Sequence, residues 1–455
     1  MNCSSERKVF FIGLGIFLLI AFIFFSICNI RTSHSFLSTL NDLEFLDLPD
    51  SVSELSPNGN FGNSGNAAII LTNVFNFVSE LSLALPTNEL SSIDELISIV
   101  DTNTLSQRRL SLKYSELTPQ DIVTLRTLLS DGDVLSVFQS LYASSILDQA
   151  SFDLESMIDW QYAQEFMSCT KLMCLNAYMS ALDGNVDKAI SELTASLRIM
   201  NLFAEIPSVP VVLVRFAGIN QIVDACEQIV EIISINDVKR DVLMDLLVEL
   251  NRSSSLNSSS LIAALDGEFI IGRETFKSLL YADIDSEEFK QRGIDKTYVF
   301  LMRYPFGCVL KSDFTQFLKN IIEVRKSAEN PFFSKEDAVR ITEDTPFWTS
   351  SSSKTLPHLL ACLRYMYICN AKLDMARIGV GLELFNKANN RYPVTLAVKS
   401  LIPEENNLYD PFSKKYYRYT SLTNSYKLYS VGPNMIDDGG VEIGSQGELL
   451  DCVWR

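Results

Sequence analysis

The sequence predicts a mainly α-helical protein with an N-terminal transmembrane helix, an α-helical bundle or helical-hairpin domain, and a small C-terminal α+β module. Three observations predict this class: an uninterrupted apolar segment near the N-terminus, apolar residues repeated at helical spacing through the middle, and aromatic and β-branched strand-like runs near the end. We expect five parts in chain order: a cytoplasmic tail (1–8), a transmembrane anchor (9–30), a stalk or linker (31–66), a helical domain (67–348), and a long helix with the α+β module (349–455).

The anchor is predicted from residues 9–30, which contain no charged side chain. A helix of about 20 apolar residues spans the roughly 30 Å hydrocarbon core of a bilayer. A cleaved signal peptide is the alternative, but its apolar region usually has about 7–15 residues and ends at small side chains. Here the run is longer, and bulky Ile27 precedes Cys28. Retention as an anchor is therefore favoured.

The charges beside the anchor predict its orientation. Arg7 and Lys8 precede it, Arg31 follows it, and the next charged residues are acidic. Because positive charge is retained on the cytoplasmic side, we expect a short cytoplasmic N-terminus. The expected location is the bacterial inner membrane, with the body of the protein in the periplasm.

The acidic composition limits the class of partner. The 455 residues carry 38 basic and 56 acidic side chains, a net charge of −18. Nucleic acid and anionic lipid surfaces repel such a body, so neither is expected as the main partner. Apolar residues make up 47% of the chain, which is typical of a folded protein. We expect the bilayer to contact residues 9–30 and an envelope protein to bind the body.

The cysteines favour buried thiols over disulfides. Seven of the nine lie beyond the anchor, and an odd number cannot all pair within one chain. Cys362 and Cys369 share a helix face, but their α-carbons would lie about 10 Å apart along the axis, beyond the reach of a disulfide. Cysteine is often buried as a small apolar residue.

The polar, Gly- and Asn-rich residues 57–66 indicate a linker, and helical patterns follow from residue 67 to about residue 338. Thr118 and Asp121 flank a first-turn proline, as in a capped helix start. We expect the Ser-rich segment 253–260 and the segment 207–210, which contains two prolines, to connect helices.

Residues 182–190 resemble the turn and second helix of a tetratricopeptide repeat. The Gly-Asn pair reverses the chain, and small Ala189 allows two helices to approach closely. No second copy follows at a fixed period, so a single helical hairpin is the favoured interpretation.

The segment 349–354 is predicted to be a polar break before a long helix from about 356 to 386. That helix ends before Pro393, which cannot continue it. Aromatic runs on both sides of residues 420–424 predict an antiparallel hairpin, and residues 449–454 a last strand.

This C-terminal stretch resembles the C-terminal module of the type II secretion major pseudopilin. The resemblance covers about residues 376–454 and depends on the series Tyr392-Pro393, Asp410-Pro411-Phe412, a Tyr-x-Tyr strand, Tyr429-Ser430-Val431-Gly432-Pro433, an acidic loop and Asp451. The family's loop binds calcium, which implies a calcium site here. The residues implied for this site are Asn434, Asp437, Asp438 and Asp451.

The N-terminal anchor differs from that family, because it contains no acidic residue and lies more than 300 residues before the module. We therefore expect no polymerisation into a pilus-like fibre. The whole layout resembles a group of uncharacterised bacterial membrane-anchored proteins, a resemblance that implies an architecture without an activity.

The sequence predicts that the protein is not an enzyme. It contains no HExxH, GxSxG or GxxxxGK[ST] motif, and its two histidines are His34 and His358. A single-pass scaffold or binding protein is the expected function, and an accessory component of a secretion or pilus-like apparatus is one alternative. The other is a carboxylate-dependent hydrolase of envelope polysaccharide, with candidate acids at Asp153, Glu155, Asp159 and Glu268.

Overall fold

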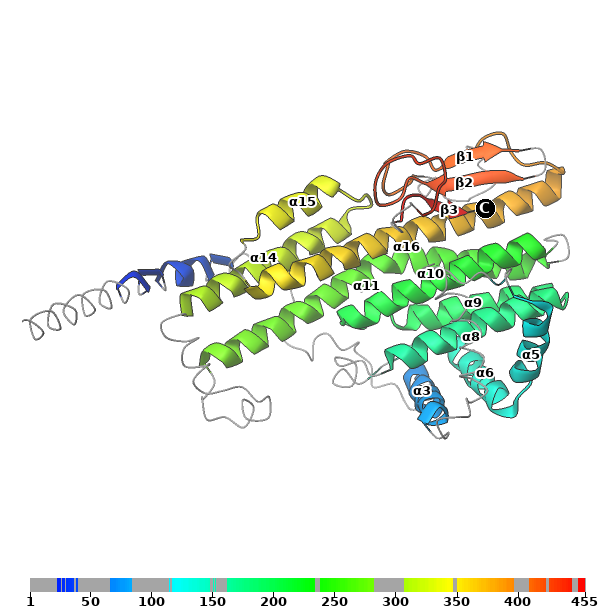
Figure 1. Cartoon of the computed structure of the whole chain (residues 1–455), viewed down its shortest axis with the longest axis horizontal. Coiled ribbons are helices and arrows are strands. Elements are labelled where there is room, and N and C mark those ends of the chain that lie inside the picture. Colours follow the sequence, from blue (N-terminus) through cyan, green and yellow to red (C-terminus); the bar gives the residue numbers. More distant parts are fainter. Residues whose placement is uncertain are drawn as a thin grey trace, which may run out of the picture. The chain divides into compact units, whose positions relative to one another are not determined.

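The computed structural model describes residues 23–25, 27–28, 30–36, 38–39, 66–83, 114, 117–147, 150, 152, 162–233, 238–281, 307–346, 350–396, 409–422, 425–443 and 449–454. It is mostly helical with a small three-stranded antiparallel sheet near the C-terminus, which confirms that part of the predicted fold class (Figure 1). The named helices are α3 (Ala67–Leu83), α5 (Pro119–Leu129), α6 (Gly132–Ser145), α8 (Ala163–Leu182), α9 (Val186–Leu202), α10 (Val209–Ile232), α11 (Arg240–Tyr281), α14 (Gly307–Glu329), α15 (Lys335–Glu343) and α16 (Ser350–Asn389).

The chain forms two compact units. Unit 1 comprises Met1–Glu54, Leu265–Ser327 and Lys335–Ala361, and unit 2 comprises Leu55–Ala264, Ala328–Ser334 and Cys362–Arg455. Helices α11 and α16 each contribute residues to both units. The five predicted parts and their boundaries stay predictions.

Most of the anchor lies outside the described residues. Between residues 23 and 39 the described residues are helical, and this helix packs on α14 within unit 1. The Lys311 ammonium donates a hydrogen bond to Ser33 Oγ at 2.9 Å, and the rings of Phe36 and Phe314 lie 5.7 Å apart. Within the described part, α10 alone is long and apolar enough to cross a membrane, but 56% of its apolar window is buried in the fold, as in a core helix.

Helices α8, α9 and α10 pack together in unit 2. The turn between α8 and α9 places Gly184 at a φ of 76°, a conformation that glycine adopts without strain. Ala189 is fully buried where the chain returns. The predicted helical hairpin is therefore confirmed.

The predicted start of α5 is also confirmed. The Thr118 hydroxyl accepts a hydrogen bond from the Asp121 amide, and the Asp121 carboxylate accepts one from the Thr118 amide. Proline stands in the first turn, where its missing N–H has no helical partner to lose.

The expected connection at residues 253–260 is wrong, because α11 continues through it. Ser253, Asn257 and Ser260 of this segment are buried, and the first two contact Arg215 of α10. The Arg215 guanidinium donates to Asn257 Oδ1 at 2.6 Å and to the carbonyl oxygen of Ser253 at 3.4 Å. A polar helix face thus packs against a buried cation, so this segment can be helical without apolar side chains.

The expected break at residues 349–354 is wrong as well, since α16 begins at Ser350. The main chain and hydroxyl of Ser352 both donate to Asp313 Oδ1 of α14, at 2.9 and 2.6 Å. Pro357 lies within the helix, after its first turn. A carboxylate from a neighbouring helix therefore stabilises this serine-rich helix start.

The predicted hairpin and last strand are confirmed. Strands β1 (Arg418–Ser421), β2 (Tyr426–Ser430) and β3 (Cys452–Trp454) form an antiparallel sheet in the order β1-β2-β3. Thr420 pairs with Lys427, and Leu428 pairs with Trp454. Alternate residues of β2 are buried.

Candidate functional site

The C-terminal module is built on the second half of α16, beside which its sheet lies in unit 2 (Figure 1). Trp454 of β3 is buried against Gly379 of α16, where an added Cβ would lie 2.3 Å from the indole nitrogen. The same nitrogen donates to the Tyr426 hydroxyl at 3.1 Å. The module is thus fixed to the helix by close packing that a side chain at position 379 would block.

Asp410 connects the loop before β1 with the end of β2. Its buried carboxylate accepts hydrogen bonds from the main-chain amides of Phe412 and Val431 and from the hydroxyls of Ser413 and Ser430, at 2.7–3.2 Å. These contacts explain why an Asp-Pro-Phe segment and a Tyr-Ser-Val-Gly segment occur in one module.

Gly432, which follows those contacts, is required by the turn. Its φ is 63°, and an added Cβ would lie 1.8 Å from the carbonyl oxygen of Leu450. The chain therefore turns closely past the start of the last strand and enters the candidate calcium loop.

Three of the four residues implied for calcium lie together. The main-chain amides of Gly440 and Asp438 donate to the two carboxylate oxygens of Asp451, at 2.6 and 3.4 Å. The Asn434 side-chain amide donates to Asp438 Oδ2 at 2.6 Å. Asp451 is fully buried, and this burial raises the pKa of its carboxyl group.

Asp437 lies apart from this group, toward the outer face of the sheet. Its carboxylate accepts hydrogen bonds from the Arg418 guanidinium at 2.8 Å and the Tyr429 hydroxyl at 3.0 Å, which lower the pKa of Asp437. The Lys427 ammonium donates to the carbonyl oxygen of Gly439. The acidic loop is thus held on the sheet by its own side chains.

The positions of these side chains determine which oxygen atoms could bind calcium. Among the described residues, no three His, Cys, Asp or Glu side chains are placed to hold one metal ion. Calcium takes six to eight oxygens. The side-chain oxygens nearest one another are the carboxylates of Asp438 and Asp451, whereas the Asn434 amide oxygen accepts a hydrogen bond from the Ile436 amide at 3.0 Å. Main-chain carbonyls and water would have to supply the other ligands.

A further buried carboxylate lies where the module meets α16. Asp374 accepts hydrogen bonds from Arg377 of the same helix at 3.2 Å and from the Tyr417 hydroxyl at 3.1 Å. Burial raises the pKa of Asp374 to about 7 despite these donors, and the nearby Asp410 charge acts in the same direction.

The other candidate groups are scattered. His34 and His358 are both exposed. Burial raises the pKa of Glu268 in α11, whereas Asp153, Glu155 and Asp159 lie outside the described residues. Cysteines in unit 2 are buried thiols, and burial raises the pKa to about 12 for Cys169, Cys226, Cys369 and Cys452.

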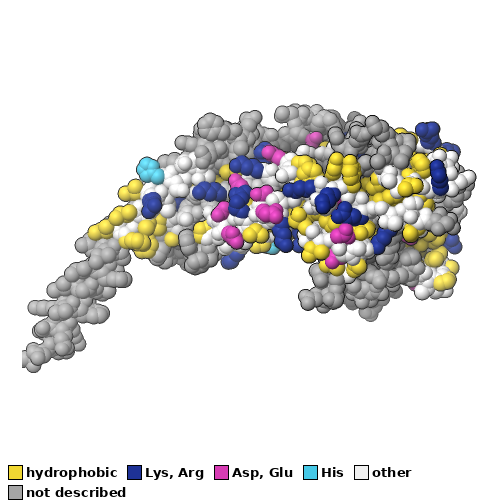
Figure 2. Space-filling model, turned by 90° about the horizontal axis from the view of Figure 1, so that it is seen from above, with side chains coloured by type: hydrophobic (Ala, Val, Ile, Leu, Met, Phe, Trp, Pro, Cys, Tyr) yellow, Lys and Arg dark blue, Asp and Glu magenta, His cyan; other side chains and the backbone are white. Residues whose placement is uncertain are grey.

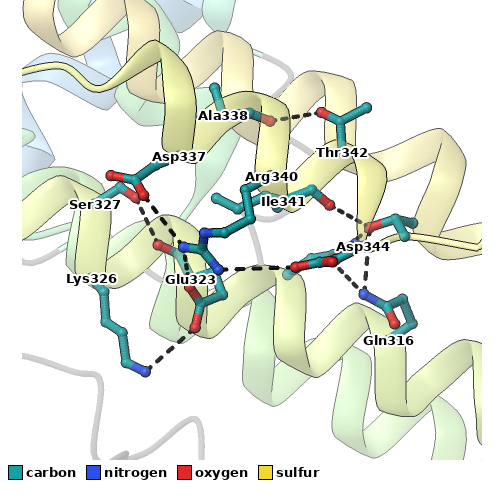
Figure 3. Close-up of polar contacts among 12 residues, drawn as sticks. Gln316, Glu323, Lys326, Ser327, Asp337, Ala338, Arg340, Ile341, Thr342 and Asp344 are labelled. Atoms are coloured by element: carbon teal, nitrogen blue, oxygen red, sulfur yellow. Dashed lines mark hydrogen bonds and ion pairs between the residues drawn. The ribbon is translucent and has the colours of Figure 1, made fainter.

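A pocket of about 550 Å³, which no sequence pattern predicted, lies in unit 1 between α14, α15 and the helix that contains Thr39. Its charged lining residues are Lys319, Glu323, Lys326, Arg340 and Asp344. Figure 3 shows Arg340 reaching from α15 to Glu323 of α14, with Lys326 on the other side of the same carboxylate. Basic and acidic side chains lie side by side on the face seen in Figure 2.

The acids of this pocket are ion-paired. Arg340 contacts Glu323 at 2.8 Å and Asp344 at 4.0 Å. Burial acts to raise the pKa of Glu323, but hydrogen bonds and charge from Arg340 and Lys326 outweigh it, so this pKa is lowered. A general acid in a glycosidase needs a raised pKa, so Glu323 is unsuited to that role. Spacings of i and i+3 on α14 could have indicated the cluster, but they are equally typical of a solvated helix face.

Comparisons with protein-family models, curated proteins and solved structures found no match for this chain.

Proposed function

We propose that the protein is a single-pass, membrane-anchored helical scaffold that binds another envelope protein on the periplasmic side. One observation carries the anchoring: the described residues of the apolar segment 9–30 are helical and expose Ile23, Phe24, Ile27 and Ile30, each by 50–64%. Exposed apolar side chains on an apolar helix are suited to lipid. Ser33 and Phe36, farther along the helix, contact α14, so the anchor would hold unit 1 directly.

The scaffold role is supported by how the module is attached. The packing of Trp454 and the hydrogen bonds of Asp410 fix the sheet on α16, so the module's outer surface is held rigidly. A rigid surface loses little conformational entropy on binding a partner. Calcium, as a structural ion at Asp438 and Asp451, would stabilise the same surface.

An accessory role in a secretion or pilus-like apparatus is the second candidate. It is favoured by the order of a long helix, an antiparallel hairpin and a last strand in the module. In that case the outer face of the sheet would be the docking surface, and the partner would be a component of the apparatus.

Membrane extraction and protease protection test the proposal. The full chain should stay in the membrane pellet after an alkaline wash, and protease added to spheroplasts should degrade its body. A variant in which Phe17, Leu18 and Leu19 are replaced by Lys should be lost from the pellet, because each charge in the apolar core is costly. Full protection of the body in intact spheroplasts would contradict the predicted orientation.

Site-directed photocrosslinking tests partner binding. A photoreactive residue at Thr420, on the outer face of the sheet, should give a discrete crosslinked product in the native membrane. The same residue at exposed Asp133 on α6 is the control. Products containing secretion components would support the second candidate, and the absence of a discrete product at both positions would contradict both.

A further inference from the structure

The pocket between α14 and α15 has the size of a small-molecule site. Its volume of about 550 Å³ lies within the usual range of roughly 300–1,000 Å³ for ligand pockets. Its lining residues all belong to unit 1. The pocket therefore needs only one compact unit to form.

Positive charge exceeds negative charge on the pocket wall, although the whole chain carries −18. Lys319, Lys326 and Arg340 face the two acids Glu323 and Asp344. The Glu323 carboxylate forms ion pairs with two of these cations, with Arg340 at 2.8 Å and with Lys326 at 3.4 Å. Lys319 is exposed, and its ammonium group has no ion-pair partner in the described part of the chain.

The wall also includes a spare neutral donor. Asn320 is 98% buried, and its Oδ1 accepts from Gln316 at 2.9 Å and Thr345 at 3.0 Å. Its amide nitrogen has no hydrogen-bond partner among the described residues. An unpaired buried donor is destabilising, so a small shift of this side chain toward a bound acceptor would be favourable.

We propose that this pocket binds a small organic anion that carries a phosphate or a carboxylate group. Lys319 supplies a charge that no acid among the described residues neutralises, and the Arg340 guanidinium has five donors, of which its acidic neighbours use only part. The oxygens of such an anion can accept hydrogen bonds from these groups, and its negative charge is opposite to theirs.

The anion has two possible sources. Thr39 lines the pocket and belongs to the helix that continues from the membrane anchor, so a phosphate could come from a lipid headgroup or from solution. Glycerol 3-phosphate is a soluble probe with the phosphate of such a headgroup, and glycerol is its neutral counterpart.

The test measures thermal unfolding of the full chain in nanodiscs. In neutral phosphatidylcholine discs, glycerol 3-phosphate should raise the unfolding midpoint saturably, and glycerol should not. If the source is lipid, phosphatidylglycerol discs should raise the midpoint instead, and added glycerol 3-phosphate should then give no further rise. Either rise should weaken with salt, because ions screen exposed charges.

Charge-changing variants distinguish binding in the pocket from a general attraction of the anion to the protein surface. Lys319→Glu should weaken glycerol 3-phosphate binding at least tenfold, and Lys319→Gln should weaken it less. Lys335→Glu makes the same charge change at an exposed position on α15 outside the pocket, and it should change the affinity by less than twofold. No midpoint shift in either lipid, or an equal loss in Lys319→Glu and Lys335→Glu, would overturn the proposal.

Discussion

Asp410 is a single residue that determines the shape of the C-terminal module. Its carboxylate accepts four hydrogen bonds from the main chain and side chains of two separate segments. The sequence analysis used the Asp-Pro-Phe segment only as part of a resemblance, and it could not show that the Asp410 carboxylate reaches β2, because Asp410 and Ser430 are 20 residues apart.

Replacing Asp410 with Ala should lower the free energy of unfolding by about 3 kcal/mol, since several buried donors would lose a charged acceptor. Urea unfolding followed by tryptophan fluorescence would measure the change. Asp437→Ala removes an exposed acid from the same module and should cost less than about 1 kcal/mol. Equal losses in the two variants would contradict the role assigned to Asp410.

At Gly379, replacement by Ala should destabilise the fold, although Gly→Ala usually stabilises a helix. In a helix interior, Gly→Ala normally adds about 0.5–1 kcal/mol of stability. At position 379 the new methyl group would collide with the Trp454 indole, so Gly379→Ala should destabilise the fold by about 1–3 kcal/mol.

Gly132 provides the matched control, because an added Cβ there has no atom within 4 Å. Gly132→Ala should leave the unfolding midpoint the same or slightly higher. A stabilised Gly379→Ala variant would mean that the module is not packed on α16 as described.

At the scale of the elements, helices and strands were predicted where a local pattern decides them. The Thr118 cap, the Gly184 turn and the aromatic hairpin each depend on residues close together in sequence, and the structure contains all three. The Ser-rich segments 253–260 and 349–354 were mistaken for breaks. Their serines are helical because Arg215 and Asp313, far away in sequence, provide polar partners.

In the candidate site, as in the helices and strands, local patterns indicated some residues, whereas contacts between distant residues could not be predicted. The acidic loop and Asp451 were proposed as a calcium site from a resemblance, and that site stays a prediction. The separation of Asp437 from the other three residues depends on Arg418 in β1, which no local pattern indicated. The pocket of α14 and α15 could not be predicted, because mixed charges at helical spacing are also typical of ordinary helix surfaces.

The contact between α16 and the module should depend on pH through Asp374. Its pKa is about 7 in the fold and about 3.9 in an unfolded chain, so the folded protein binds more protons between these values. The contribution of Asp374 to stability is therefore fully present below about pH 4 and is lost as the pH rises through about 7.

Asp374→Asn should remove this loss, which we expect to be about 2 kcal/mol between pH 5 and pH 8. Urea unfolding at several pH values would measure it, with the exposed Asp133→Asn variant as control. An unchanged pH profile in Asp374→Asn would show that other groups cause the dependence.

Calcium should stabilise the module if the loop binds it. At 100 times its dissociation constant, a folded-state ligand adds about 2.7 kcal/mol. Thermal unfolding with calcium and with chelator should differ in the wild type, and the difference should disappear in Asp451→Ala. Asp437→Ala should retain it, because Asp437 points to Arg418. Loss of the calcium effect in both variants would contradict the assignment of ligands.

The whole molecule combines a strongly acidic surface with buried carboxyl groups. Besides Asp374, burial raises the pKa of Asp224 in α10 and of Glu192 in α9, and Asp224 contacts Lys372 of α16 at 2.6 Å. Repulsion within a body of charge −18 opposes folding.

Added salt should therefore stabilise the protein at neutral pH, since it screens exposed like charges more than buried pairs. The unfolding midpoint should rise between about 0.02 M and 0.3 M sodium chloride. A sulfate comparison at equal ionic strength separates screening from general salt effects. A falling midpoint would mean that surface ion pairs outweigh the repulsion.

The packing of Trp454 on Gly379 also constrains the order in which the protein is made. The helix that supports the module is synthesised about 75 residues before the strand that covers it. Until that strand is made, the surface of α16 at Gly379 lacks the Trp454 side chain that covers it in the fold. A chain that stalls on the ribosome before residue 454 would therefore expose this surface to chaperones and proteases.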